Sequence, residues 1–485
     1  MSDATPSAKP FEQLSREELL ELARSQEEKI ARLRRLHERP VQPQPSAKRR
    51  KKKARKQIDF STCRKRHIAV KFAYIGEKYY GLAMQDGFDT VEGRLVKACQ
   101  QAQLIPTDGD MNAVNWSRSG RTDKGVSSLG NVFSAVVRCK ASTGVGVVGA
   151  QSTQEESEMD YIRILNGMLP PDIRCFAWAP VPANFSARFS CISRCYKYYF
   201  FEDGMDIDAM RVAAGKLVGT HDFRNLCKAD VRDVSHFVRT LHSFEVRKAT
   251  GSRMSGVGRQ DALWEVQISG SGFLYHQVRM MMAVLFHVGQ GKESPAVVDQ
   301  LLDVARYPCR PQYDMASDKP LLLFDTVYDS DLVRWRVDPD AQLNVFRLFH
   351  RQWREQTISL KLHDVVAQHA LGNYLLAKEG NPGLQYDLTE VSTDVVDGNP
   401  DTFTGTQLRQ WQRNQSKKPT PMMERKKGDS LVAQVRKLKP DERQSFDNKR
   451  ATLRSHMCDH NENLSERERA LVQSFLDETE LQDTQ

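Results

Sequence analysis

Alternating apolar and polar residues predict most of the strands of this protein. Residues 68–74 carry an apolar side chain at every second position, which is typical of a half-buried strand. Residues 131–138 form a more continuous apolar run, as in a buried strand. The same reasoning predicts three further strands, over residues 195–201, 238–247 and 263–268.

Apolar residues at helical spacing predict helices between these strands. Thr90 is suited to cap a helix over the residues that follow it, and residues 275–288 carry an apolar stripe that would face a core. Two more helices are predicted near residues 159–168 and 207–217. Because helices and strands mix in both halves, we expect an α+β fold with two lobes, each an antiparallel or mixed sheet backed by helices.

The segments outside the two lobes have a different character. A capping box at Ser15 and Glu18 begins a charged helical pattern up to about residue 37, which fits a solvated helix or a short coiled coil. Four parts are therefore predicted. They are an N-terminal helix with a basic disordered tract (1–65), a first lobe with the loop described below (66–180), a second lobe (181–330) and a partly helical, partly disordered accessory extension (331–485).

Positive charge is concentrated in one short tract. The net charge is +9, and residues 48–56 supply eight positive charges, so the rest of the chain is near +1. Such a tract can be a nuclear-import signal, a tether to RNA phosphate or a solvated block. Any affinity of the two lobes for nucleic acid must therefore come from local patches of charge.

Composition favours a soluble protein of a reducing compartment. No apolar run approaches the length of a membrane helix, and the first residues lack the apolar core of a signal peptide. The nine cysteines are odd in number and scattered, which argues against a disulfide framework. The nearest approach to a metal cluster is His456-x-Cys458-x-His460 in a polar tail, so no metal site is predicted. We expect the protein in the nucleus, the cytoplasm or both.

The loop over residues 116–128 concentrates the candidate chemistry. Gly120 and Gly125 bracket a single carboxylate, Asp123, with the cations Arg121 and Lys124 beside it. Glycines permit backbone conformations that bring a side chain close to a ligand, and neighbouring cations favour the ionised form of a carboxylate. Asp123 is therefore suited to act as a base, a nucleophile or an ion-pair anchor. A solvated turn with ordinary surface charges would carry the same residues.

The segment from Gly120 to Val126 resembles the signature loop of the tRNA pseudouridine synthases of the TruA family. Four other segments resemble motifs of that family in the same order along the chain. They are residues 80–92, 185–198, 219–228 and 272–279. The continuation of the loop to Ser128 is most similar to the eukaryotic branch, which modifies positions 38 and 39 of the tRNA anticodon stem-loop.

The resemblance implies a pseudouridine synthase fold and a role for each of four residues. Asp123 matches the catalytic aspartate of the family, which attacks the nucleotide covalently, and Arg279 matches an arginine that pairs with it. Arg121 matches the loop arginine, placed to hold phosphate or to help extrude the base. Tyr196 matches the tyrosine that stacks on the target base. His276 is equally compatible with a packed histidine at the start of a helix.

The function implied by the resemblance is the isomerisation of uridine to pseudouridine in tRNA. No cofactor is expected, because the reaction involves neither net redox change nor group transfer. The expected partner is tRNA, no membrane partner is expected, and a homodimer like that of bacterial relatives is left open. One alternative is a catalytically inactive RNA-binding relative. Another is a metal-dependent nuclease, but that would require further carboxylates around Asp123, which the sequence does not offer.

Three features depart from the family pattern. Leu82 stands where the family usually has an aromatic residue, and Ser119 stands where it has a small apolar residue or cysteine. Residues 141–160 are small and polar and predict an unusually long inserted surface loop. Since none of these involves the four residues with implied roles, they bear on the choice of substrate more than on activity.

Overall fold

The computed structural model describes residues 58–107, 110–148, 158–228, 230–232, 234–249, 262–378, 420–458 and 464–480. Apart from Ile58, these residues belong to one compact unit, Asp59–Gln485. The predicted helix up to residue 37, the basic tract at 48–56 and part of the insert at 141–160 lie outside the described residues, as does His460.

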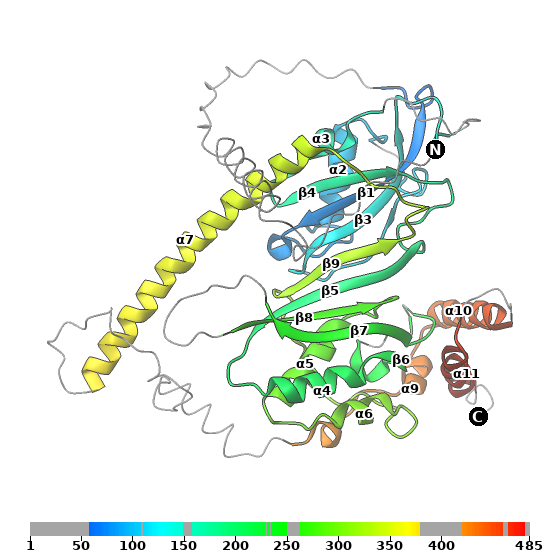
Figure 1. Cartoon of the computed structure of the whole chain (residues 1–485). Coiled ribbons are helices and arrows are strands. Elements are labelled where there is room, and N and C mark those ends of the chain that lie inside the picture. Colours follow the sequence, from blue (N-terminus) through cyan, green and yellow to red (C-terminus); the bar gives the residue numbers. More distant parts are fainter. Residues whose placement is uncertain are drawn as a thin grey trace, which may run out of the picture. The chain divides into compact units, whose positions relative to one another are not determined.

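One mixed sheet runs through the centre of this unit (Figure 1). From one edge to the other its strands are β10 (Arg336–Val337), β4 (Ile173–Pro180), β1 (Lys65–Tyr74), β3 (Ser127–Arg138), β9 (Leu321–Tyr328), β5 (Cys191–Phe201), β8 (Leu263–Gly270), β7 (Val238–Lys248) and β6 (Gly219–Asp222), with β2 (Ser117–Arg118) paired to β3 beside them. The five strands predicted from the sequence are confirmed as β1, β3, β5, β7 and β8.

The two halves of the sheet meet where β3 lies beside β9. This is the one parallel pairing among the described strands, and it joins Ser127 to Leu322 and Ser128 to Leu323. The Ser128 hydroxyl donates to the Leu323 carbonyl at 3.0 Å, which adds a side-chain bond to the junction. The α+β class with a mixed sheet backed by helices is therefore confirmed, and the sheets of the two predicted lobes are continuous.

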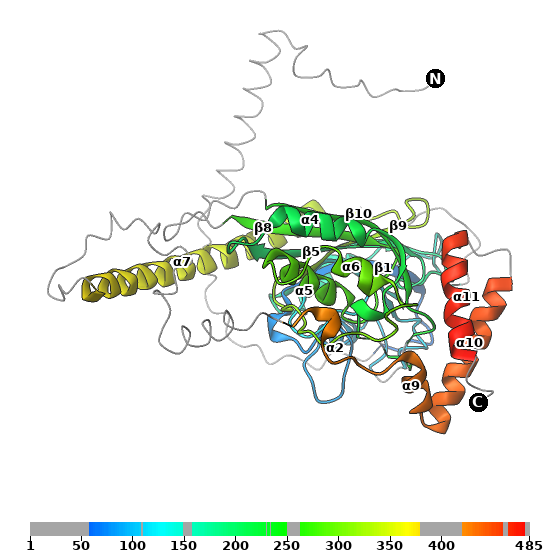
Figure 2. The ribbon, with the colours of Figure 1, turned by 90° about the horizontal axis from the view of Figure 1, so that it is seen from below.

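Helices cover the sheet and extend beyond it. Their bounds are α2 (Val91–Gln101), α3 (Tyr161–Asn166), α4 (Ile207–Lys216), α5 (Gln277–Gly289), α6 (Val297–Leu302), α7 (Pro339–Lys378), α9 (Leu431–Arg436), α10 (Pro440–Cys458) and α11 (Glu466–Glu480), with short 3-10 turns η2 (Gly76–Lys78), η3 (Arg224–Leu226) and η6 (Met422–Glu424). Helices α2 and α3 share one core with β1 and β3, while α4, α5 and α6 share a second core with β5, β7 and β8. Figure 2 shows these elements from below.

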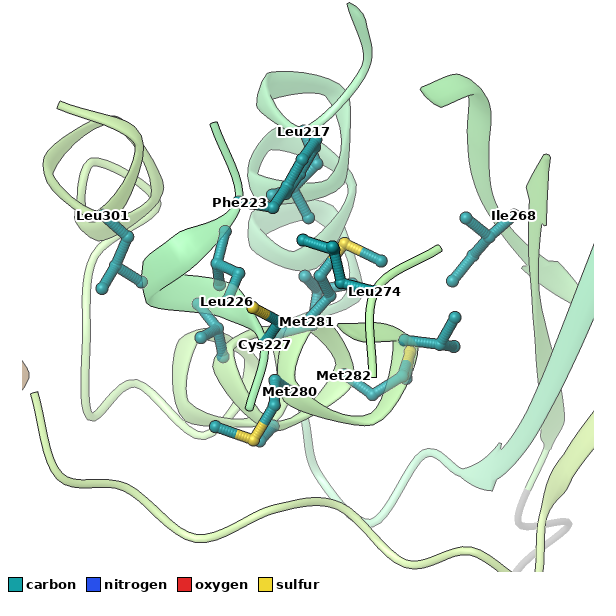
Figure 3. Close-up of a cluster of buried hydrophobic side chains, with 14 of the residues drawn as sticks. Leu217, Phe223, Leu226, Cys227, Ile268, Leu274, Met280, Met281, Met282 and Leu301 are labelled. Carbon is teal, nitrogen blue, oxygen red and sulfur yellow. The ribbon is translucent and has the colours of Figure 1, made fainter. Parts of the chain in front are cut away.

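Helix α5 forms the centre of the second core. Met280, Met281, Met282 and Leu285 are all at most 2% exposed, so almost the entire circumference of the helix is buried. Figure 3 shows Met281 close to Leu226 and Cys227, which follow β6, and Ile268 of β8 lies on the other side of the cluster. A helix that is apolar on nearly every side has little freedom to shift, so the side chains at its start are held in fixed positions.

The last described helices complete this second core. Phe446 of α10 and Phe475 of α11 are each 1% exposed and belong to the same apolar cluster as α5. Arg224 is buried and binds Asp222 at 2.7 Å and Glu478 of α11 at 2.5 Å. Figures 1 and 2 both show α10 and α11 close to each other at the end of the sheet that carries β6. The predicted domain boundaries stay predictions, but residues of α9, α10 and α11 share a core with the second lobe.

The described residues contain neither a helix suited to span a membrane nor a cluster of metal-ligating side chains. None of the helices in this part of the chain has both the length and the apolar character needed to cross a membrane. Among the same residues, no three His, Cys, Asp or Glu side chains gather in a way that could hold a metal ion.

The packing of α11 predicts that its core residues stabilise the whole second lobe. Phe475 lies 6.1 Å, centroid to centroid, from Phe237 in an edge-to-face arrangement. We expect Phe475→Ala to lower the free energy of unfolding by about 3–5 kcal/mol, because it leaves a cavity among buried side chains. Urea denaturation measures this change. Phe346→Ala is the matched control, since Phe346 of α7 is 59% exposed, and an equal loss there would contradict the prediction.

Candidate active site

Asp123 lies on the loop between β2 and β3, and the residues around it are fixed by the first lobe. The Thr122 hydroxyl bonds the buried Tyr74 hydroxyl at 2.7 Å, and the Thr122 carbonyl accepts a hydrogen bond from the Leu82 amide at 3.1 Å. On the other side, the Val126 amide donates to the Asp123 carbonyl at 3.2 Å. With both neighbours anchored, the carboxylate projects from a fixed backbone.

Gly125 is required by the space around the loop as well as by its conformation. Its φ of +81° lies in the left-handed region, which side chains other than that of glycine rarely adopt. A Cβ at this position would come 2.4 Å from a carboxylate oxygen of Asp318. The Gly125 amide also donates to the Tyr79 carbonyl at 3.3 Å, so the loop is held against the first lobe on this side too.

Two side chains from the start of α5 meet the Asp123 carboxylate. Arg279 Nη1 and His276 Nε2 each lie 3.4 Å from the same oxygen, Asp123 Oδ2. The Arg279 Nε atom donates to the Ala316 carbonyl at 2.8 Å, which fixes the guanidinium. All three side chains are between 12% and 19% exposed, so this ion pair is mostly shielded but still open to a ligand.

His276 has an unusual backbone and a shifted titration. Its φ is +62° at the residue before α5, a left-handed conformation that histidine tolerates better than most side chains do. Burial lowers the pKa of its imidazole, the charges of Arg279, Lys228 and Arg310 lower it further, and only Asp123 opposes them. The imidazole is therefore mainly neutral at pH 7, and it can accept or donate a hydrogen bond beside the carboxylate.

Tyr196 lies on β5 with its ring in the second core. It is 8% exposed and packs edge-to-face on Phe273, with the ring centroids 5.0 Å apart. Burial raises the pKa of the Tyr196 hydroxyl to about 12, and the negative charge of Asp123 adds to this shift. The phenol is therefore uncharged at physiological pH, and it senses the charge of Asp123.

Arg121 does not join this group. Its side chain is exposed, and its charge acts with those of Arg194 and Arg118 on Arg188, whose pKa is lowered mainly by burial. The structure therefore brings Asp123 and Arg279 into direct contact, with Tyr196 near them, while Arg121 belongs to a neighbouring cluster of arginines.

Arg194 was not singled out by the sequence, although it lies in a motif. Its Nε and Nη2 atoms donate to the Ser119 carbonyl at 3.0 and 2.8 Å, directly before the loop of Asp123. Nη2 also donates to the Arg188 carbonyl at 2.8 Å, and Nη1 donates to the Ser271 carbonyl at 2.8 Å. One guanidinium thus joins its own motif segment to the residues directly before two others, the segments 120–126 and 272–279. The sequence offers one signal for this role of Arg194, its position two residues before Tyr196.

Glu92 is a second residue that was overlooked. Its carboxylate is 3% exposed and accepts hydrogen bonds from Arg118 at 2.6 Å, from the Trp116 indole at 2.8 Å and from the Met84 amide at 2.9 Å. These contacts fix the chain that leads into the loop of Asp123. A buried carboxylate with this many donors is a structural anchor.

Comparison with known proteins identifies the family. A sequence model described as tRNA pseudouridine synthase matches residues 213–329. A mouse protein named tRNA pseudouridine(38/39) synthase is 39% identical over 360 residues, which cover 72% of this chain and 73% of that protein. The chain belongs to the TruA family of tRNA pseudouridine synthases.

Relatives in this TruA family extend from mammals to archaea. The Bos taurus protein named tRNA pseudouridine(38/39) synthase is 41% identical over 320 residues, 64% of this chain and 65% of that protein. The chain thus spans just under two thirds of the length of this relative. A protein of Methanothrix thermoacetophila, named tRNA pseudouridine synthase A, is 31% identical over 60% of this chain and 92% of its own length.

The geometry of this TruA-family site predicts how the imidazole of His276 titrates. Asp123→Asn removes the one charge that raises the pKa of His276, so that pKa should fall further below its ordinary value. Arg279→Gln removes a cation that lowers it, so the pKa should rise. NMR titration of the histidine ring resonances measures both shifts. Shifts of the same sign in the two variants would contradict the geometry described here.

Proposed function

We propose that this TruA-family protein isomerises uridine to pseudouridine in the anticodon stem-loop of tRNA, at positions 38 and 39. The observation that carries the proposal is the contact of Asp123 with Arg279 across 156 residues of sequence, at the position of the signature loop. The names of the mammalian relatives support the choice of positions.

Asp123 is the proposed nucleophile. In the reaction the bond from uracil N1 to the sugar C1′ breaks and a bond from C5 to C1′ forms, while C5 loses a proton and N1 gains one. Nothing is oxidised or reduced, so the proposal includes no cofactor. A carboxylate paired with Arg279 is suited to covalent attack, at either the sugar or the base.

Three further residues take supporting roles in the proposal. Arg279 holds the nucleophile in place, since a carboxylate this shielded needs a charged partner. The uncharged ring of Tyr196 offers a face for the extruded uracil. Arg121, exposed on the same loop, is suited to hold a phosphate or to take the place of the extruded base.

The first test is pseudouridine formation in an anticodon stem-loop tRNA by the full-length protein and by Asp123→Asn. We expect conversion at position 38 or 39 with the wild type and none with Asp123→Asn, because an amide is a far weaker nucleophile than a carboxylate. Mass spectrometry after chemical labelling of pseudouridine measures the product.

Other outcomes of this test separate the alternatives. Conversion by both proteins would remove Asp123 from the role of nucleophile. Tight binding of several tRNAs without conversion by either protein would favour the inactive RNA-binding relative. Loss of activity on addition of a chelator would point to metal-dependent chemistry.

We propose that the basic tract at 48–56 directs nuclear import, holds tRNA, or does both. The protein would accordingly be found in the nucleus, in the cytoplasm or in both. Deleting the tract should move the protein to the cytoplasm in the first case. In the second it should weaken tRNA binding and reduce the salt dependence of that binding. An unchanged location together with an unchanged affinity would contradict both proposals.

Light scattering of the same samples tests whether the protein forms a homodimer.

A further inference from the structure

A surface loop beside the candidate active site carries an exposed phenyl ring. Phe189 is 80% exposed, although Phe185, four residues earlier in the same motif, is 2% exposed and packs in a core. Single exposed apolar residues are common on protein surfaces and need no explanation by themselves. Phe189 differs from such residues because its backbone is held by hydrogen bonds and because positive charges lie beside it.

Hydrogen bonds on both sides hold the backbone that carries Phe189. The Ala187 amide donates to the Ser117 hydroxyl at 2.8 Å, and the Ala187 carbonyl accepts from the Tyr328 hydroxyl at 2.7 Å. The Ser190 amide donates to the Ser186 carbonyl at 2.9 Å. The ring is therefore presented to solvent by a rigid loop, and it loses little conformational freedom when a ligand stacks on it.

Four arginines that act on one another electrostatically lie near the start of the signature loop, and one of them lies against this ring. We call them the arginine cluster: Arg121, Arg188, Arg194 and Arg239. The Arg188 guanidinium lies 5.1 Å from the centroid of the Phe189 ring. Arg194 links the Arg188 carbonyl to the Ser119 carbonyl, so the cluster adjoins the loop of Asp123.

Arg239 lies on the far side of the same cluster. Its side chain passes Gly272, where a Cβ would come within 3.9 Å of its Cδ and Nε atoms, and Arg194 binds the adjacent Ser271 carbonyl. Burial lowers the pKa of Arg239 to about 10; the charge of Asp222 opposes this shift, and the charges of Arg188 and Arg194 add to it.

The cluster has no salt-bridge partner in the part of the chain that the structure describes, although the charge of Asp222 acts on Arg239. None of its four arginines forms a salt bridge there, whereas neighbouring Arg118 is paired with Glu92 at 2.6 Å. Four like charges with no carboxylate in direct contact repel one another, so the arrangement favours an anion from outside. Phosphate is the anion that arginine suits best, because the planar guanidinium can bind two of its oxygens.

We propose that Phe189 and the arginine cluster form a subsite for a nucleotide next to the target uridine, with its base stacked on Phe189 and its phosphate held by the cluster. This inference rests on the proposed function. Extrusion of a uridine exposes the face of a neighbouring base, and an aromatic ring can replace the stacking partner that is lost. The subsite would therefore offset part of the cost of extrusion.

The test uses full-length protein and an anticodon stem-loop RNA with 2-aminopurine next to the target uridine, on one side and then on the other. Binding is titrated in the Asp123→Asn background so that no turnover occurs. We expect Phe189→Ala to weaken binding roughly 5- to 100-fold, the range for loss of one stacked base. The same substitution should also abolish the quenching of 2-aminopurine fluorescence at one of the two positions next to the target uridine. Phe189→Trp should preserve both.

Phe201→Ala is the matched control, because Phe201 at the end of β5 is 44% exposed and lies outside the subsite. Unchanged affinity and quenching in Phe189→Ala, with a thermal midpoint equal to that of the wild type, would overturn the proposal. An equal loss of affinity in Phe201→Ala would also overturn it. Wild-type conversion of unmodified tRNA is measured separately, so failure of the subsite and failure of the proposed function are distinguishable.

The phosphate contact has its own measurement. Arg188→Gln should reduce the slope of log affinity against log salt by roughly 0.7, the value for one phosphate of single-stranded nucleic acid. Arg334→Gln, with a side chain that is 82% exposed in the segment after β9, is the control and should leave the slope unchanged. An unchanged slope in Arg188→Gln would remove Arg188 from the subsite.

Discussion

The pairing of β3 with β9 is the constraint on which the rest of the site depends. It involves two residue pairs, yet it joins the half of the sheet that carries Asp123 to the half that carries Tyr196 and α5. Gly130 allows the close approach, because a Cβ there would come 2.7 Å from the Phe324 carbonyl. The Thr326 hydroxyl donates to the Gly130 carbonyl at 2.7 Å and closes the junction. A shift at this seam would separate the carboxylate from its partners.

The site is assembled from side chains that are costly to bring together. Asp123 and Arg279 give up hydration, and His276 adopts a left-handed backbone. The surrounding structure offsets these costs by holding each group independently, with Arg194 fixing the loop and the buried α5 fixing the arginine. Such preorganisation allows a carboxylate to act without rearrangement when a substrate arrives.

The local part of this architecture could be predicted from the sequence, and the non-local part could not. Alternation identified β1, and an apolar stripe identified α5, because both patterns depend only on neighbouring residues. The strands β4 and β9 were not predicted, and the parallel seam at β9 depends on pairing across nearly 200 residues. The contact of Asp123 with Arg279 was expected only from the resemblance to the family. The role of Arg194 could not be predicted from the sequence, since its partners are backbone carbonyls, which every residue supplies.

The contribution of α11 to the second core has a consequence for synthesis of the chain on the ribosome. Phe237 and α5 emerge long before Phe475 and Leu476, which complete the apolar cluster. The growing chain must therefore keep an unfinished apolar surface until α10 and α11 have left the exit tunnel. Arg224 likewise lacks its salt bridge to Glu478 until α11 has been synthesised. The second lobe therefore reaches its final packing only after residues 466–480 have been synthesised.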